Sequence, residues 1–287
     1  MKHVGYLLNL GIVGYDDAWD AQRSLAAAVS QGAIPDTIVL LEHPPTVTLG
    51  RRTGSEELHL PSGVEAEIVE TDRGGKSTYH APGQLVCYPI LDLKRHGQDV
   101  KRYVRDLEEA LVQTLAAFGL EGQRIEGLTG VWMTRPSAVP GASLASGGGG
   151  DSAVARPARQ SAVQRRERSV EPGSARREPS AARGGGPRKI ASIGVHISHW
   201  VTTHGYALNV DLDPAPFTDW ITACGLEEAA FTTMARELGR PLTVEDVRPA
   251  AVDALAEVFD LAFEELPAED GTGLWPQPRH AQLAEKP

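Results

Sequence analysis

The sequence predicts an α+β domain, a mixed β-sheet with flanking helices. Short apolar runs rich in β-branched residues alternate with longer segments whose apolar residues recur every three or four positions. Hydrophobic residues make up 41% of the 287-residue chain, which is enough for a packed core. No G-x-G-x-x-G turn joins a predicted strand to a helix, so a dinucleotide-binding fold is not supported.

Three helices are predicted from capping residues and apolar periodicity. The first covers residues 18–29 and has Asp16 or Asp17 as its N-cap. The second follows Asp99 and carries a stripe of apolar side chains at steps of three and four. The third follows Thr243, which has an acidic residue three positions later and therefore the pattern of a capping box.

Seven short apolar segments predict strands, and turn-forming residues bound most of them. They are residues 38–41, 46–49, 68–71, 85–90, 127–133, 190–197 and 204–210. The fifth and sixth of these segments are the two strands of a predicted hairpin whose turn has been expanded.

The expansion is residues 134–187, which differ in composition from the rest. Ala, Gly, Arg, Ser and Pro account for 42 of these 54 residues, and the segment has no aromatic side chain. Such a segment cannot bury enough apolar surface to offset its ordering entropy, so we expect a disordered insert. We therefore predict one folded domain over residues 1–266, interrupted at 134–187, and a loose tail at 267–287. The insert is either a tolerated loop expansion or, since its charge is +5, a tether for an acidic partner.

Charge and cysteine content exclude several classes of protein. The net charge of −10 disfavours nucleic acid as a partner, because phosphate binding needs clustered Lys and Arg. No run of 18 apolar residues predicts a membrane-spanning helix, and the N-terminus lacks the pattern of a signal peptide. Two cysteines cannot form a disulfide framework, so we expect a cytoplasmic protein whose thiols are free for chemistry.

The densest candidate site is RGGKSTYHAPGQ, residues 73–84, between two predicted strands. Its glycines let the backbone approach a ligand closely, and Tyr79 and His80 add an aromatic face and a titratable ring. The same pattern also fits a glycine-rich hairpin that binds nothing.

A second candidate block is KIASIGVHISHWVTTHGYALNV, residues 189–210. Lys189 opens a predicted strand and can project at the rim of a pocket, although a solvated surface charge is the alternative. Small residues on this strand and the next, such as Gly194 and Gly205, leave room for an apolar guest. His199 and His204 have no matching Cys or carboxylate spacing, so we expect no metal.

A third block, FTDWITACGLEEA, contains Cys224 outside any periodic apolar pattern. A cysteine in such a turn can be a nucleophile, although an isolated cysteine is more often inert. Cys87 lies in an apolar strand segment and is expected to be structural.

Together, these three blocks resemble the lipoyl/octanoyl transferase family in order and spacing, over about 50 residues. The resemblance implies a biotin/lipoate protein ligase-like fold and a role in lipoate biosynthesis. It implies transfer of octanoyl or lipoyl from acyl carrier protein, through a thioester on Cys224, to a lysine of lipoyl domains. It implies that Lys189 lowers the pKa of that thiol. The implied acyl-binding residues are Arg73, Gly74, Gly75, Lys76, Ser77, Thr78, Tyr79, His80, Ser192, Ile193, Gly194, Gly205, Tyr206 and Ala207.

The resemblance also implies partners and cofactors. The expected donor is octanoyl-acyl carrier protein, and the expected acceptors are lipoyl domains of 2-oxoacid dehydrogenase complexes and the glycine cleavage H protein. No cofactor or metal is expected, because a thioester donor is already activated. No nucleic acid or membrane partner is expected either, because of the net charge and the lack of a long apolar run.

The chain departs from the family pattern at three places. Ala81 stands where the family usually has Gly, and Ala223 stands where it usually has Pro before the nucleophile. Neither change removes a reacting atom. The third departure is the insert, which ends just ahead of Lys189. If the insert disturbed the start of that strand, catalysis would be affected most.

Two other functions remain open from the sequence. An ATP-dependent lipoate or biotin ligase would share the fold and a lysine near position 189, but it needs no Cys224. A catalytically silent acyl-binding protein would keep the pocket without a reactive thiol.

Overall fold

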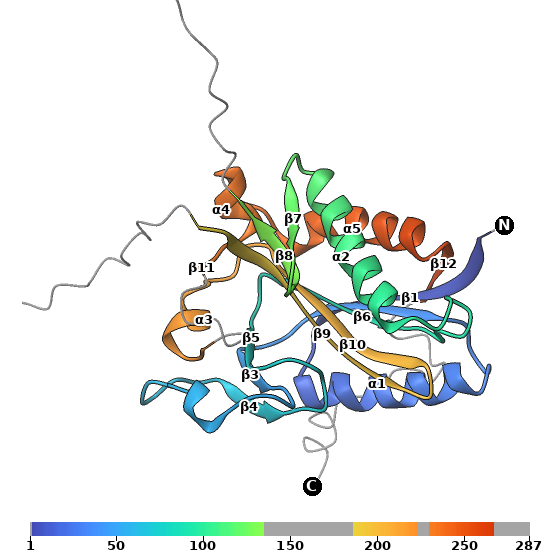
Figure 1. Ribbon diagram of the computed structural model, residues 1–287, viewed down its shortest axis with the longest axis horizontal. Coiled ribbons are helices and arrows are strands. Elements are labelled where there is room, and N and C mark those ends of the chain that lie inside the picture. Colours follow the sequence, from blue (N-terminus) through green and yellow to red (C-terminus); the bar gives the residue numbers. More distant parts are fainter. Residues whose placement is uncertain (1, 135–185, 223–229, 267–287) are drawn as a thin grey trace, which may run out of the picture. The chain divides into compact units, whose positions relative to one another are not determined.

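The computed structural model describes residues 2–134, 186–222 and 230–266 (Figure 1). All of them belong to one unit, formed by residues 1–134 and 186–287. The predicted insert, except Thr134 and residues 186–187, and the predicted tail lie outside the described residues, so the expected disorder of both stays a prediction. No helix in the described ranges is long and apolar enough to cross a membrane.

The described residues form a nine-stranded mixed sheet of order β12-β1-β2-β6-β10-β9-β8-β7, with β11 beside β9. β1 pairs in parallel with β12 and β2, and β11 in parallel with β9, while the other pairs are antiparallel. The strands are β1 (His3–Ile12), β2 (Thr37–Glu42), β6 (Gln84–Ile90), β7 (Gly122–Ile125), β8 (Leu128–Met133), β9 (Arg188–Ser198), β10 (Val201–Asn209), β11 (Ala230–Phe231) and β12 (Leu261–Leu266).

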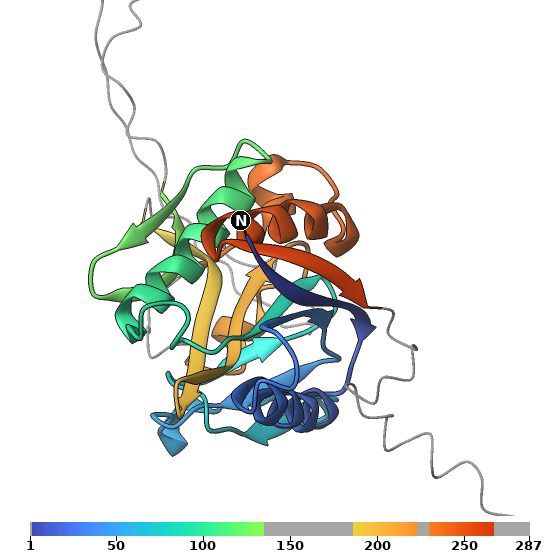
Figure 2. The same cartoon turned by 90° about the vertical axis from the view of Figure 1, so that its right-hand side faces the viewer.

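Helices cover both faces of this sheet, as Figure 2 shows. α1 (Tyr15–Ser30) packs on one face, while α2 (Val100–Ala116) and α5 (Val244–Val258) pack together on the other. Alternate residues of the central strands therefore enter different cores: Leu40 packs with the α2 and α5 side, and Leu41 with the α1 side. Burial on both faces explains why these strands are continuous apolar runs.

A small second sheet of order β4-β3-β5 lies beside the main one and carries the first candidate block. It consists of β3 (Thr46–Leu49), β4 (Glu67–Glu70) and β5 (Thr78–His80). The remaining short elements are η1 (Ser55–Glu57), α3 (Pro216–Asp219) and α4 (Met234–Leu238). We call residues 71–77, between β4 and β5, the glycine loop.

The three predicted helices and seven predicted strands are present, which confirms the α+β fold class. Asp99 caps α2, and Thr243 forms the predicted capping box with Asp246. The predicted cap of α1 is wrong. Gly14 is the N-cap and the helix begins at Tyr15, so that Asp16 and Asp17 lie in the first turn, where carboxylates also favour a helix.

The predicted hairpin is present on both sides of the insert. β8 and β9 pair antiparallel, and Met133 is the cross-strand partner of Arg188. The two chain ends that flank the insert thus leave the sheet next to each other.

Deleting residues 137–186 is therefore expected to leave a folded protein. The deletion joins the two strands through four residues, a normal length for a hairpin loop. The thermal unfolding transition should stay cooperative, with a midpoint within a few degrees of the parent chain. Loss of the cooperative transition would contradict the prediction that the insert adds nothing to the core.

Candidate active site

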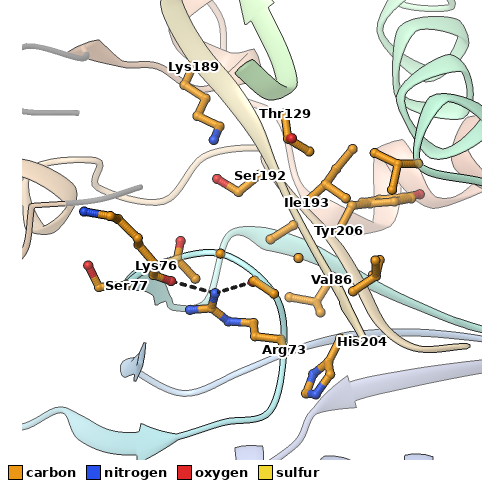
Figure 3. A pocket seen from close by; sticks show the side chains of 18 of the residues that line it. Arg73, Lys76, Ser77, Val86, Thr129, Lys189, Ser192, Ile193, His204 and Tyr206 are labelled. Carbon is orange, nitrogen blue, oxygen red and sulfur yellow. Dashed lines mark hydrogen bonds between the residues drawn. The ribbon is translucent and has the colours of Figure 1, made fainter. Parts of the chain in front are cut away.

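A cavity of about 370 Å³ lies where β9, β10 and β6 face the glycine loop. In Figure 3, Lys189 and His204 lie at opposite ends of its lining, with Arg73 and Lys76 on the loop between them. Apolar side chains such as Val86, Ile193 and Ala207 form part of the wall. The cavity thus has a charged end, partly apolar walls and a second end that is aromatic and polar.

Arg73 fixes the shape of the glycine loop from within. Its side chain is 7% exposed and donates to the Thr48 carbonyl at 2.8 Å, to the Thr48 hydroxyl at 2.7 and 3.1 Å, and to the Lys76 and Gly74 carbonyls at 2.6 and 3.2 Å. The Gly74 N–H donates to the Val195 carbonyl of β9 at 3.0 Å. The guanidinium joins the loop to β3, and the backbone joins it to β9.

Replacing Arg73 by Met should lower the free energy of unfolding by about 3 kcal/mol, because buried acceptors lose their donor. The measurement is urea unfolding of the parent and the variant. Arg51→Met, a change at an exposed position near the loop, is the control and should cost less than about 0.5 kcal/mol. Equal effects of both changes would show that Arg73 does not fix the loop.

Lys189 lies at the charged end of the cavity and is only 3% exposed. Its ammonium lies 5.3 Å from the centre of the Trp132 ring. The Lys189 carbonyl accepts from Thr232 N–H at 3.0 Å, and Phe231 of β11 pairs with it in register. The alternative that Lys189 is a solvated surface charge is therefore wrong.

The other end of the cavity is formed by aromatic and titratable side chains from distant segments. His204 Nε2 contacts the Asp72 carboxylate at 2.7 Å, and its Nδ1 lies 3.4 Å from the Tyr15 hydroxyl. His80 Nδ1 lies 2.7 Å from the Gln84 side-chain oxygen. Tyr88 lines the cavity, and its hydroxyl contacts the Nε2 atom of His43, which does not line the cavity, at 2.6 Å.

Burial favours the neutral form of these histidines. Burial lowers the pKa of His43 to about 4, lowers that of His80 well below its usual range, and lowers that of His204. Because neutral His43 donates from Nδ1 to the Val13 carbonyl at 2.7 Å, its Nε2 accepts from Tyr88.

His204 reaches this end through an interruption in the pairing of β6 and β10. Pro89 has no N–H for the ladder, and the Thr202 hydroxyl bridges the gap by donating to the Pro89 carbonyl at 2.6 Å and accepting from Leu91 N–H at 2.9 Å. His204 has φ +57°, and its N–H donates to Gln22 of α1 at 2.6 Å instead of to a strand. The side chain is thereby presented to the cavity.

The buried neutral histidines predict a pH dependence of stability. Their unfolded pKa, about 6.5, exceeds the folded value, so the unfolded chain binds more protons in acid and stability falls as pH falls below about 6.5. For His43 the loss continues to about pH 4. Between its unfolded and its folded pKa, each such histidine should lower the free energy of unfolding by about 1.4 kcal/mol for every pH unit of acidification.

Urea unfolding between pH 7.5 and 5 checks this, with His43→Gln expected to show a smaller dependence than the parent. His3→Gln, at an exposed position, is the matched control and should keep the parent slope. If the unfolding free energy of His43→Gln changed with pH as steeply as that of the parent, buried His43 would not be a source of the pH dependence.

All but one of the acyl-binding residues that the resemblance implies and the structure describes line this one cavity. Tyr79 is the exception, since its ring packs edge-on against Phe217 and Trp220. The residues that line it are Arg73, Gly74, Gly75, Lys76, Ser77, Thr78, His80, Ser192, Ile193, Gly194, Gly205, Tyr206 and Ala207, and Lys189 joins them.

Strand packing alone requires a glycine at position 205, whether or not a ligand binds beside it. A Cβ at this position would collide with the Cys87 carbonyl oxygen of β6. The glycine thus permits the close approach of two central strands. Cys87 itself is fully buried, and burial raises the pKa of its thiol, as expected for a structural cysteine.

Cys224 and Ala223 lie outside the described residues, but both flanks of their segment are described. On one side, the Thr222 N–H donates to the Glu57 carbonyl at 2.9 Å, and the Thr222 carbonyl accepts from the Ser77 hydroxyl at 3.3 Å. On the other side, Phe231 pairs with Lys189. The described residues on either side of the Cys224 segment, Thr222 and Phe231, therefore contact Ser77 and Lys189, two residues that line the cavity.

Several lining residues were absent from the sequence prediction. Trp132 is the cross-strand neighbour of Lys189, a relation that the predicted hairpin could have indicated. Tyr15 and Tyr88 carry no local signal, because only the packing of α1 on the sheet brings them together. Among the described residues, no group of three His, Cys, Asp or Glu side chains could hold a metal.

Comparison with solved structures shows that the fold is similar to that of two lipoate protein ligases. A bipartite lipoate protein ligase from Thermoplasma acidophilum superposes with a TM-score of 0.57 over 93% of this chain and 88% of its own, at 14% identity. An ATP-bound lipoate-protein ligase A gives 0.56 over 93% and 90%, at 13% identity. These likenesses define the fold.

The sequence defines the family. Residues 14–256 match the lipoyl protein ligase A/B catalytic domain, and the chain belongs to that family. It is 40% identical to an octanoyltransferase of Chloroflexus aurantiacus, over 88% of this chain and 92% of that protein. It is 42% identical to one of Mycobacterium marinum, over 92% and 90%.

Proposed function

We propose that the chain is an octanoyltransferase of lipoate biosynthesis that carries the acyl group on Cys224. The observation that supports this best is that the two described flanks of the Cys224 segment, Thr222 and Phe231, contact Ser77 and Lys189, which line one cavity. The relatives at about 40% identity are named for this activity.

The first half-reaction is a thioester exchange. The Cys224 thiolate attacks the acyl carbonyl carbon, a new C–S bond forms, and the thiolate of the carrier leaves with the electrons of the old C–S bond. An unperturbed thiol is mostly protonated at neutral pH, so a nearby ammonium such as that of Lys189 favours the reactive form.

The second half-reaction transfers the acyl group to an amine. The acceptor lysine attacks the acyl-Cys224 carbonyl carbon, the amide C–N bond forms, and Cys224 leaves as thiolate. The attacking amine must lose a proton, and Lys189, which lines the cavity, is the proposed acceptor once it has given its own proton to the departing carrier thiolate.

The acyl chain occupies the partly apolar stretch of the cavity away from Lys189. Val86, Ile193 and Ala207 contact it there, and the glycine loop covers it. A thioester donor needs no ATP and no metal for either step.

The proposed donor is octanoyl-acyl carrier protein, and the acceptors are lipoyl domains, including those of 2-oxoacid dehydrogenase complexes and the glycine cleavage H protein. The proposed location is the cytoplasm, where a reducing environment keeps the thiol of Cys224 available.

The test is incubation with octanoyl-acyl carrier protein, followed by peptide mass spectrometry and then addition of a lipoyl domain without ATP. Octanoyl should appear on Cys224 and then move to the acceptor lysine. Transfer that depends on ATP would instead identify a ligase, and a cavity that binds octanoate without any adduct would identify an acyl-binding protein.

A further inference from the structure

Lys189 owes its position to a bulge in the hairpin that carries it. Val131 of β8 pairs with Ala191, but Trp132 pairs with Lys189, so one step along β8 corresponds to two steps along β9. Such a bulge re-aims the neighbouring side chains. Contacts with neighbouring elements must therefore fix β8 in this register next to the cavity.

Gly130 is the residue of β8 that makes room for the Lys189 side chain. Its φ is +114°, and a Cβ there would lie 2.9 Å from Lys189 Cε and 2.5 Å from the Ala191 carbonyl oxygen. The stem of Lys189 therefore occupies the space that a side chain at position 130 would need.

Glu108 of α2 holds Gly130 from the other side. Its carboxylate accepts from the Gly130 N–H at 3.1 Å, and the residue is 7% exposed. The second carboxylate oxygen lies 3.5 Å from Arg124 Nε of β7. One turn earlier on the same helix, Val104 lines the cavity, so α2 contacts both the cavity wall and the strand beneath Lys189.

We propose that Glu108 is a positioning residue for Lys189, acting through its hydrogen bond to the Gly130 N–H. The carboxylate keeps β8 in the bulged register. In that register there is space beside Gly130 for the Lys189 side chain to extend into the cavity. This inference rests on the proposed function for its catalytic consequence, but not for its structural content.

The experiment compares Glu108→Met, which fills the same volume without an acceptor, with Glu108→Gln, which keeps one acceptor oxygen for Gly130. Glu109→Ala is the matched control, because Glu109 is the next residue of α2, pairs with the same Arg124, and does not contact Gly130. Octanoyl transfer should fall about tenfold or more in Glu108→Met, and stay within about threefold of the parent in Glu108→Gln and Glu109→Ala.

Two readouts separate positioning from loss of stability. The pH midpoint of Cys224 alkylation should rise in Glu108→Met, in the same direction as in Lys189→Met. The acetylation rate of Lys189 by acetic anhydride, followed by peptide mass spectrometry, should rise several-fold in Glu108→Met at a temperature where the variant is folded. Glu108→Gln should restore both.

Parent-like labelling of Lys189 and parent-like transfer in a folded Glu108→Met protein would overturn the proposal, and so would a Glu108→Gln protein as impaired as Glu108→Met. If Glu108→Met does not fold, Glu108→Ala decides, since it removes the same carboxylate acceptor without adding bulk, and parent-like Lys189 labelling and transfer there would overturn the proposal. A parent protein that forms no octanoyl adduct would overturn the proposed function alone, because Lys189 labelling does not depend on it.

Discussion

A Cys224→Ala protein should lose octanoyl transfer by at least about a thousandfold while the chain still folds. The proposed mechanism has no other acceptor for the acyl group in its first step, and removal of a covalent nucleophile has effects of this size or larger. Single-turnover transfer from octanoyl-acyl carrier protein to a lipoyl domain is the measurement, with the thermal midpoint recorded alongside.

Cys87→Ala is the matched control for that experiment. Cys87 is fully buried in β6 and burial raises the pKa of its thiol, so it cannot supply a thiolate near neutral pH. Its loss should lower stability by about 1–2 kcal/mol through a small cavity and leave transfer intact. Substantial transfer by Cys224→Ala would refute the covalent route.

Substitutions of Lys189 should have the second largest effect on octanoyl transfer. They can separate its two proposed roles, which are to favour the Cys224 thiolate and to accept a proton from the attacking amine. Lys189→Met keeps the apolar stem and removes the charge, so the pH midpoint of Cys224 alkylation should rise, and acylation at neutral pH should slow by about one to two orders of magnitude. Lys189→Arg keeps the charge but cannot release a proton at accessible pH, so acylation should be partly preserved and attack by the amine impaired.

The structure adds a constraint on the arginine variant. Trp132 and Gly130 enclose the Lys189 side chain, so the larger guanidinium also meets a steric penalty. Separate measurement of the two half-reactions distinguishes the penalty from the missing base, because a steric effect slows both. An alkylation midpoint unchanged in Lys189→Met would mean that Lys189 does not activate the thiol.

The central fold was predictable because its strands and helices carry strong local signals. β2 and β6 are buried on both faces and appear as short apolar runs, and α2 combines a capping Asp99 with a regular apolar stripe. β12 could not be predicted in the same way. Its sequence, LAFEEL, contains two adjacent glutamates that break the apolar run, and it is a strand because β1, far away in the sequence, supplies its hydrogen-bond partners.

The residues of the candidate site likewise fall into those with a local sequence signal and those without one. The glycine loop and the Lys189 strand are continuous motifs, so their residues could be named from the sequence. The end formed by Tyr15, Tyr88 and His204 depends on the packing of α1 and on a left-handed backbone at a non-glycine residue. Such a conformation has no local signature, because the surrounding contacts impose it.

The parallel pair of β1 and β12 has a consequence for synthesis of the protein. His3 pairs with Leu261, so the chain must be made beyond Leu261 before β1 acquires its second neighbour. Until then a nascent chain exposes one unpaired edge of β1, including the half-exposed Val4, to other chains emerging nearby. Ribosome-bound intermediates that stop before β12 should therefore be the species most dependent on chaperones. Truncation before β12 should lower the yield of folded protein by more than the small loss of core would suggest.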